Sequence, residues 1–181
     1  GFNPEAALTW RQQRALSGNN IMSMGILNET VRRYVGHEAA VTAHGKTFIA
    51  ERQTEEGGPA KADVPDSIGI VAEHENGVMS VYHVSTVARG GRGSALEFYG
   101  TKGGFRLEDS RATILGTDGY EDLVIPPEKA YGWRVEEEFV EAIRDGAPVT
   151  RTSFADGVKY MEFTEAVTIS LAEGRRVDLP L

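Results

Sequence analysis

Apolar residues recur at three- and four-residue steps near the start of the chain, which is the spacing of one face of an α-helix. The residues are Met24, Leu27, Val31, Tyr34 and Val35. Gly36 follows them, and glycine is common just after the end of a helix. The pattern predicts a helix over about 24–35, preceded by a turn at 17–20.

Two more helices are predicted toward the C-terminal end. The first carries apolar residues from Val135 to Ile143 and is followed by Gly146. The second starts at Ser153, where an acidic residue three positions later gives the spacing of a capping box. Its apolar stripe is Tyr160, Phe163, Val167 and Leu171.

The intervening residues alternate β-prone runs with turn signals. Asn76-Gly77 separates two apolar runs and is typical of a tight hairpin, in which both positions favour positive φ. Further hairpins are predicted to turn at 100–104 and at Asp118-Gly119. A polar stretch at about 53–66, containing two glycines and two prolines, is predicted to be a flexible loop.

Shorter strands are predicted at 7–13, 41–43, 47–49 and 176–179. Consecutive hairpins favour an antiparallel sheet, and the small number of helices is enough to cover one face only. The predicted fold class is therefore α+β, an open-faced and mostly antiparallel sheet with helices packed on one face. A length of 181 residues fits one domain over 1–181. The bare sheet face requires polar residues or a partner.

Composition and charge exclude several classes of function. The net charge is -8 and the basic residues are scattered, which argues against nucleic acid as a partner. The absence of cysteine excludes disulfides and thiolate metal sites, and it fits a cytoplasmic protein. No apolar run reaches the ~18 residues that span a bilayer, so no membrane association is expected.

Five segments together resemble a known family. They are a glycine-led helix entry (17–26), a helix end (33–36), a strand–GTKG–strand hairpin (96–104), a helix (139–146), and a closing helix and strand (153–179). In order and spacing they resemble the C-terminal domain of the glucose–fructose oxidoreductase/inositol dehydrogenase (Gfo/Idh/MocA) family.

This resemblance implies an oxidoreductase whose NAD or NADP is bound mainly by an N-terminal Rossmann domain, which is absent from this chain. The family's catalytic lysine also belongs to that absent half. The glycines at 90–93 and 100–104 lack the strand–turn–helix context of a dinucleotide site. The GTKG segment invites a phosphate-binding interpretation, but a tight hairpin explains it more simply.

Many family members place an Asp and, four residues later, a His at the start of the first long helix. The matching positions here are Ser23 and Leu27, neither of which transfers protons near neutral pH. The catalytic residues are therefore unknown, and ordinary sugar or polyol dehydrogenation is in question.

The substrate-binding candidates are Arg11, Asn19, Asn20, Ser23 and Glu29. The two asparagines and the serine are suited either to binding substrate hydroxyls or to capping the helix. Arg11 is a candidate for an anionic substrate, with Trp10 as an apolar wall, or else forms a surface pair with it. Glu29 is spaced for ion pairs with Arg32 and Arg33. The four histidines lack metal-ligand spacing, so no metal site is predicted.

The expected function is a substrate-binding and oligomerisation domain of an NAD(P)-dependent oxidoreductase that acts on a sugar- or polyol-like small molecule. Its open sheet face is expected to form a homodimer or tetramer. The alternatives are a non-catalytic family relative and a stand-alone, sheet-mediated interaction domain.

Overall fold

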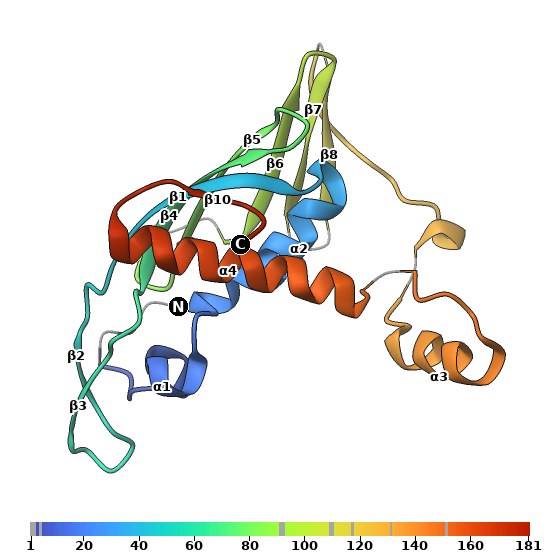
Figure 1. Cartoon of the computed structure of the whole chain (residues 1–181). Helices are drawn as coiled ribbons and strands as arrows, with labels where there is room; N and C mark the ends of the chain where they lie inside the picture. The colour runs from blue at the N-terminus through green and yellow to red at the C-terminus, as the bar shows by residue number, and fades with distance from the viewer. Residues whose placement is uncertain are drawn as a thin grey trace. The chain divides into compact units, whose positions relative to one another are not determined.

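The structure is a computed structural model that describes residues 3, 5–90, 93–108, 111–116, 118–130, 132–150 and 152–181. The chain forms two compact units, one from residues 1–90 and 152–181 and the other from residues 91–151 (Figure 1). Every strand pair in both units is antiparallel, which confirms the predicted α+β class.

The first unit is built on a four-stranded sheet with the strand order β10-β1-β4-β5. A two-stranded sheet, β2-β3, accompanies it. The strands are β1 (Glu38–Lys46), β2 (Glu51–Gln53), β3 (Pro59–Lys61), β4 (Ser67–His74), β5 (Met79–Ser85) and β10 (Val177–Asp178). The helices are η1 (Trp10–Gln12), α1 (Arg14–Ser17), η2 (Ile21–Ser23), α2 (Met24–Val35) and α4 (Phe154–Glu173).

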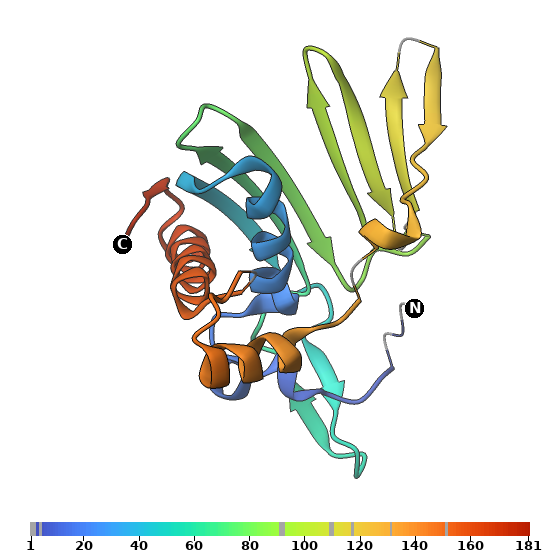
Figure 2. The same cartoon turned by 90° about the vertical axis from the view of Figure 1, so that its right-hand side faces the viewer.

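The core of this unit lies between the sheet and helices α2 and α4, which cover the same sheet face (Figure 2). Strand β4 shows why: its residues alternate strictly, with Ile68, Ile70 and Ala72 buried and their neighbours turned outward. Phe163 of α4 is fully buried, and its ring centroid lies 5.5 Å from that of Tyr82 on β5. Burial of this apolar surface holds the two layers together.

The opposite sheet face is bare. Val71, Met79 and Val81 lie on it with exposed fractions of 43%, 68% and 71%. Val71 and Val81 are direct cross-strand partners on β4 and β5. This face of the first unit therefore presents apolar side chains, whereas the sequence-based expectation was that it would carry polar residues or meet a partner.

Local signals define both ends of α4. The Ser153 hydroxyl accepts from the Asp156 amide at 3.2 Å, and the Asp156 carboxylate accepts from the Ser153 amide at 2.8 Å. This is the predicted capping box. The hydrogen bonds from Ser153, the backbone one first, lower the pKa of Asp156 because they favour its charged form. Gly174 ends the helix with a φ of 65°.

The second unit is a four-stranded meander with the order β6-β7-β8-β9, followed by two helices. Phe98 and Phe105 stack on one of its faces with ring centroids 4.2 Å apart. Its elements are β6 (Ala95–Gly100), β7 (Gly103–Glu108), β8 (Arg111–Gly116), β9 (Gly119–Asp122), η3 (Pro127–Lys129) and α3 (Val135–Asp145).

Several local predictions need correction. Residues 7–13 do not form an edge strand, because residues 10–12 close into the 3-10 turn η1, where the Gln12 amide bonds Thr9 O at 3.1 Å. Residues 47–49 are not a strand, because the Asp66 carboxylate takes the amides of Phe48 and Ile49 at 2.9 Å.

The segment 53–66 is not loop throughout, since residues 59–61 pair with β2. The chain packs as two compact units, and the expectation of a single domain over 1–181 stays a prediction. In the Asn76-Gly77 turn only Gly77 has a positive φ, of 85°.

Candidate functional site

The entry to α2 has an unusual backbone. Met22 (φ 48°) and Ser23 (φ 59°) are consecutive non-glycine residues in the left-handed region. This conformation costs about 1–3 kcal/mol per residue and persists where the surroundings impose it, often at functional sites. We therefore take this entry, residues 19–23, as the candidate site.

Close packing beneath the entry holds it in place. The Asn20 side chain accepts from the Gly25 amide at 3.2 Å, and Ile21 is fully buried. A Cβ added at Gly25 would lie 3.4 Å from the Tyr160 ring and 3.5 Å from Thr164. Helices α2 and α4 therefore lie close together at this glycine, where an added methyl group would make ordinary van der Waals contact.

Asn19 joins a polar chain that crosses the entry. Its side-chain oxygen accepts from Arg14 Nη1 at 3.0 Å, and its amide donates to the Glu165 carboxylate on α4. The Arg14 backbone amide donates to Asp63 at 2.7 Å. Arg14 and Glu165 were not among the predicted site residues. No sequence signal pairs residues 19 and 165, because only the fold brings them together.

Two other predicted substrate-binding residues, Ser23 and Arg11, lie in different surroundings. The Ser23 side chain is half-buried and forms no capping hydrogen bond within the described residues. Arg11 is exposed, and its guanidinium lies 4.1 Å from the Trp10 ring centroid, as expected for a surface pair. Its 3-10 helix, η1, contacts η2 and so borders the entry.

Glu29 lies apart from this group. Its carboxylate accepts from Arg33 Nε at 2.7 Å, and Arg33 also donates to the Thr152 hydroxyl at 2.9 Å. The structure thus joins Glu29 in an i,i+4 ion pair with Arg33. The second cation expected for it, Arg32, is bound to Glu38 instead.

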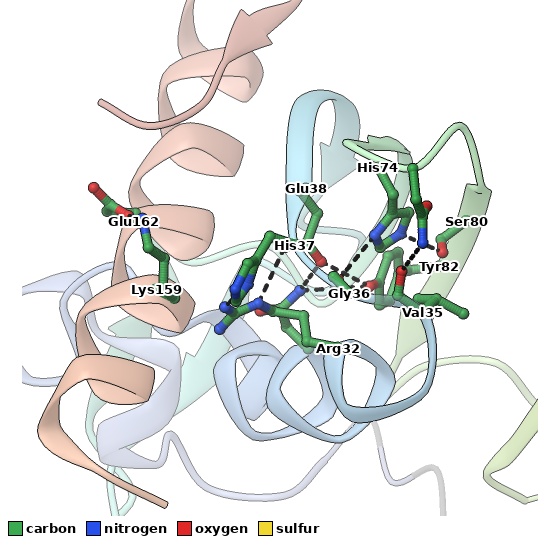
Figure 3. A network of polar contacts seen from close by, with 12 residues as sticks. Arg32, Val35, Gly36, His37, Glu38, His74, Ser80, Tyr82, Lys159 and Glu162 are labelled. Atoms are coloured by element: carbon green, nitrogen blue, oxygen red, sulfur yellow. Dashed lines mark hydrogen bonds and ion pairs between the residues drawn. The ribbon is translucent and has the colours of Figure 1, made fainter.

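The far end of α2 is tied to the sheet by a buried polar network (Figure 3). Arg32 Nε lies 3.4 Å from Glu38 Oε2, and both side chains are almost completely buried. The other carboxylate oxygen of Glu38 accepts from Asn28 at 2.5 Å and from the Tyr82 hydroxyl at 3.5 Å. Arg32 also contacts the exposed His37 ring.

The β4–β5 hairpin secures the last residues of α2. Asn76 donates to the Val35 carbonyl at 2.8 Å. His74 is buried between the Gly36 carbonyl, 3.1 Å from Nδ1, and the Ser80 hydroxyl, 2.7 Å from Nε2. These contacts attach the C-terminal end of α2 to the β4–β5 hairpin.

The network itself is not a substrate site. The cavity beside it, lined by residues that include Arg32, His37, Glu38 and Lys159, measures about 20 Å³. That volume suits about one water molecule. The network therefore has a structural role.

Among the described residues, no group of three or more His, Asp or Glu side chains is placed to bind a metal ion. Gly100 and Gly103 are cross-strand partners in the β6–β7 hairpin, which agrees with the simpler interpretation of the GTKG segment. In the glycine stretch at 90–93, Gly91 and Arg92 lie outside the described residues. None of the described helices combines the length and apolar character needed to cross a bilayer.

The site and fold define an α+β domain with a hydrogen-bonding turn at the start of its first long helix. A family model described as the GFO/IDH/MocA C-terminal domain matches residues 1–106. The match includes more than half of the chain, and the chain belongs to this family. A search of the curated proteins finds no match.

Solved structures match nearly the whole chain. Levoglucosan dehydrogenase in complex with NADH and L-sorbose is 25% identical with a TM-score of 0.83, covering 98% of this chain and 55% of that one. An NAD binding oxidoreductase from Klebsiella pneumoniae is 16% identical with a TM-score of 0.84, covering 99% and 56%. An oxidoreductase domain protein from Kribbella flavida is 20% identical with a TM-score of 0.83 and the same coverage. The chain thus spans about half the length of these proteins, and the last two support the fold alone.

Removing Glu38 should destabilise the protein strongly. The Glu38→Ala variant leaves Arg32 as a buried, unpaired charge, and such losses cost about 3–5 kcal/mol in unfolding free energy. Urea denaturation measures the change. The control, Glu29→Ala, breaks the more exposed pair with Arg33 and should cost under about 1 kcal/mol. Equal losses in the two variants would contradict the role assigned to the network.

Tyr82 should make the protein sensitive to alkaline pH. Burial, and after it the charge of Glu38, raises the pKa of Tyr82 above its ordinary value of 10.0. The hydroxyl therefore contributes stability that is fully present below pH 10 and is lost as the pH rises toward the folded-state pKa. Unfolding free energies of wild type and Tyr82→Phe, measured between pH 8 and 11, should diverge above about pH 10. Parallel pH profiles would contradict this expectation.

Proposed function

We propose that this chain is the substrate-binding and oligomerisation domain of an NAD(P)-dependent oxidoreductase that acts on a sugar- or polyol-like small molecule. The observation that carries the proposal is the match over 98% of the chain to levoglucosan dehydrogenase, solved with NADH and L-sorbose. The nicotinamide cofactor, NAD or NADP, is bound mainly by a separate nucleotide-binding domain. A cytoplasmic location stays a prediction.

The entry turn is the proposed substrate site. Ser23 supplies a hydroxyl, and Asn19 and Asn20 supply amides that are already held by Arg14, Glu165 and Gly25. Such groups bind and orient hydroxyls but do not remove a proton near neutral pH. Leu27 stands one helical turn beyond Ser23, where proton relay would need an ionisable side chain. Proton transfer is therefore assigned to groups outside this turn.

One alternative is that the chain belongs to a non-catalytic family relative. The residues Ser23 and Leu27 favour it, because neither transfers protons near neutral pH. A stand-alone interaction domain, bound through the bare sheet face, is the third possibility. Turnover by the full-length protein separates the first proposal from both alternatives.

Substitution at Ser23 tests the site. In the full-length protein, Ser23→Ala should lower kcat/KM for the best sugar or polyol substrate by about 2- to 12-fold, the effect of one lost hydrogen bond worth 0.5–1.5 kcal/mol. The matched control is Thr30→Ala, because the Thr30 hydroxyl bonds Ile26 O within α2. Cofactor reduction at 340 nm measures the rate.

Two results would count against this proposal. One is the absence of turnover with either cofactor across a panel of sugars and polyols. The other is sub-micromolar NAD affinity of the 181-residue chain alone, since that would place a cofactor site in this domain.

Assembly through the bare face of the β10-β1-β4-β5 sheet is a separate part of the proposal, and its apolar residues support it. Val81→Asp should convert the full-length dimer or tetramer to a smaller species, because a charge would be buried without a partner. Sedimentation velocity measures the mass. Val124→Asp, at another highly exposed valine, is the control. A wild-type protein that is strictly monomeric would exclude this mode of assembly.

A further inference from the structure

The four-stranded meander of the second unit carries a hollow on one face. Its volume is about 530 Å³. That size lies within the range of about 300–1,000 Å³ typical of small-molecule sites. The lining residues are Arg106, Glu108, Arg111, Thr113 and Tyr120.

The strand register explains why these five side chains meet. Arg106 pairs with Thr113 across β7 and β8, and Glu108 pairs with Arg111 one step along the same face. Tyr120 on β9 pairs with Leu115, which lies two residues from Thr113. Since side chains two residues apart in a strand point to the same face, all five project from one side of the sheet.

Ion pairs hold the polar groups in place without any ligand. Arg106 donates to Glu97 at 2.9 Å and lies 3.0 Å from Glu108. Arg111 donates to both oxygens of Asp122, at 2.7 and 3.0 Å. Groups ordered in advance lose less entropy on binding, so the hollow is suited to recognition by fixed hydrogen bonds.

The charges indicate the class of ligand. Two guanidinium groups, of Arg106 and Arg111, are balanced by three carboxylates, of Glu97, Glu108 and Asp122. An anion would meet excess negative charge, and a cation would compete with arginines that already occupy the carboxylates. A neutral ligand that both donates and accepts hydrogen bonds fits this set of partners best.

Tyr120 adds an apolar surface at one end of the hollow. Its side chain is 57% exposed, and Thr113 lies on the neighbouring strand with a hydroxyl on the same face. An exposed aromatic face beside fixed polar groups matches a ring that has apolar C–H faces and a rim of hydroxyls. We propose that this hollow binds a neutral, polyhydroxylated ring such as a pyranose, at a site separate from the entry turn.

The test is a nuclear magnetic resonance titration of the ¹⁵N-labelled chain with D-glucose. Binding should saturate with a dissociation constant of about 1–10 mM, the strength expected for a ligand of twelve non-hydrogen atoms. The shifted amides should lie in β7, β8 and β9. D-glucose 6-phosphate should bind more weakly, because its phosphate faces the excess of carboxylates.

Substitutions assign the binding to the hollow. Tyr120→Ala should weaken glucose binding about tenfold through loss of the ring, whereas Tyr120→Phe keeps the ring and should retain most of the affinity. Tyr34→Ala, at an exposed tyrosine of α2, is the matched control and should bind as wild type does. Because Tyr120 is exposed on the edge strand β9, folding should survive its replacement.

Three outcomes would overturn the proposal. The first is no saturable shift in β7–β9 up to 100 mM glucose, including the case in which a second copy of the chain covers this face. The second is binding that perturbs only residues 19–23 and persists in Tyr120→Ala. The third is tighter binding of the phosphorylated sugar, which would mean that the site selects anions.

Discussion

The buried contact between Arg32 and Glu38 is the interaction on which the rest of this domain depends. It joins the last turn of α2 to the first residue of β1, and only two residues separate the end of α2 from the start of β1. Asn28 and Tyr82 complete the coordination of the carboxylate. Buried charges are costly unless they are paired, so this ion pair favours a placement of α2 that keeps Arg32 next to Glu38, although Arg32 Nε has no hydrogen-bond partner among the described residues.

The network holds the C-terminal end of α2, and the candidate site lies at its N-terminal end. The twelve-residue helix α2 also packs on α4 near Gly25. The left-handed residues Met22 and Ser23 directly precede this packed helix. The same packing that stabilises the domain thus keeps the hydrogen-bonding groups of the entry turn in one arrangement.

The sequence predicted elements whose signals are local. Each of these signals depends on residues a few positions apart. They are the capping box at Ser153, the glycines that end helices at 36 and 174, and the β4–β5 hairpin that turns at Gly77. Prediction failed where a distant residue decided the backbone, as when the Asp66 carboxylate took the amides of Phe48 and Ile49. For the candidate site, the sequence suggested Asn19, Asn20 and Ser23, which stay predictions, and it gave no sign of the contacts that Arg14 and Glu165 make with Asn19.

By itself, the sequence determined the α+β class, the helix boundaries near 36, 153 and 174, and a likeness to the family to which the chain belongs. These features follow from short-range periodicity and turn chemistry, which depend on residues close to one another in the sequence. Only the tertiary structure decided which charges are buried, that Asn19 meets Glu165, and that Arg106 and Arg111 share a hollow with Tyr120. Such pairings arise from strand register and layer packing, which join residues that no local pattern connects.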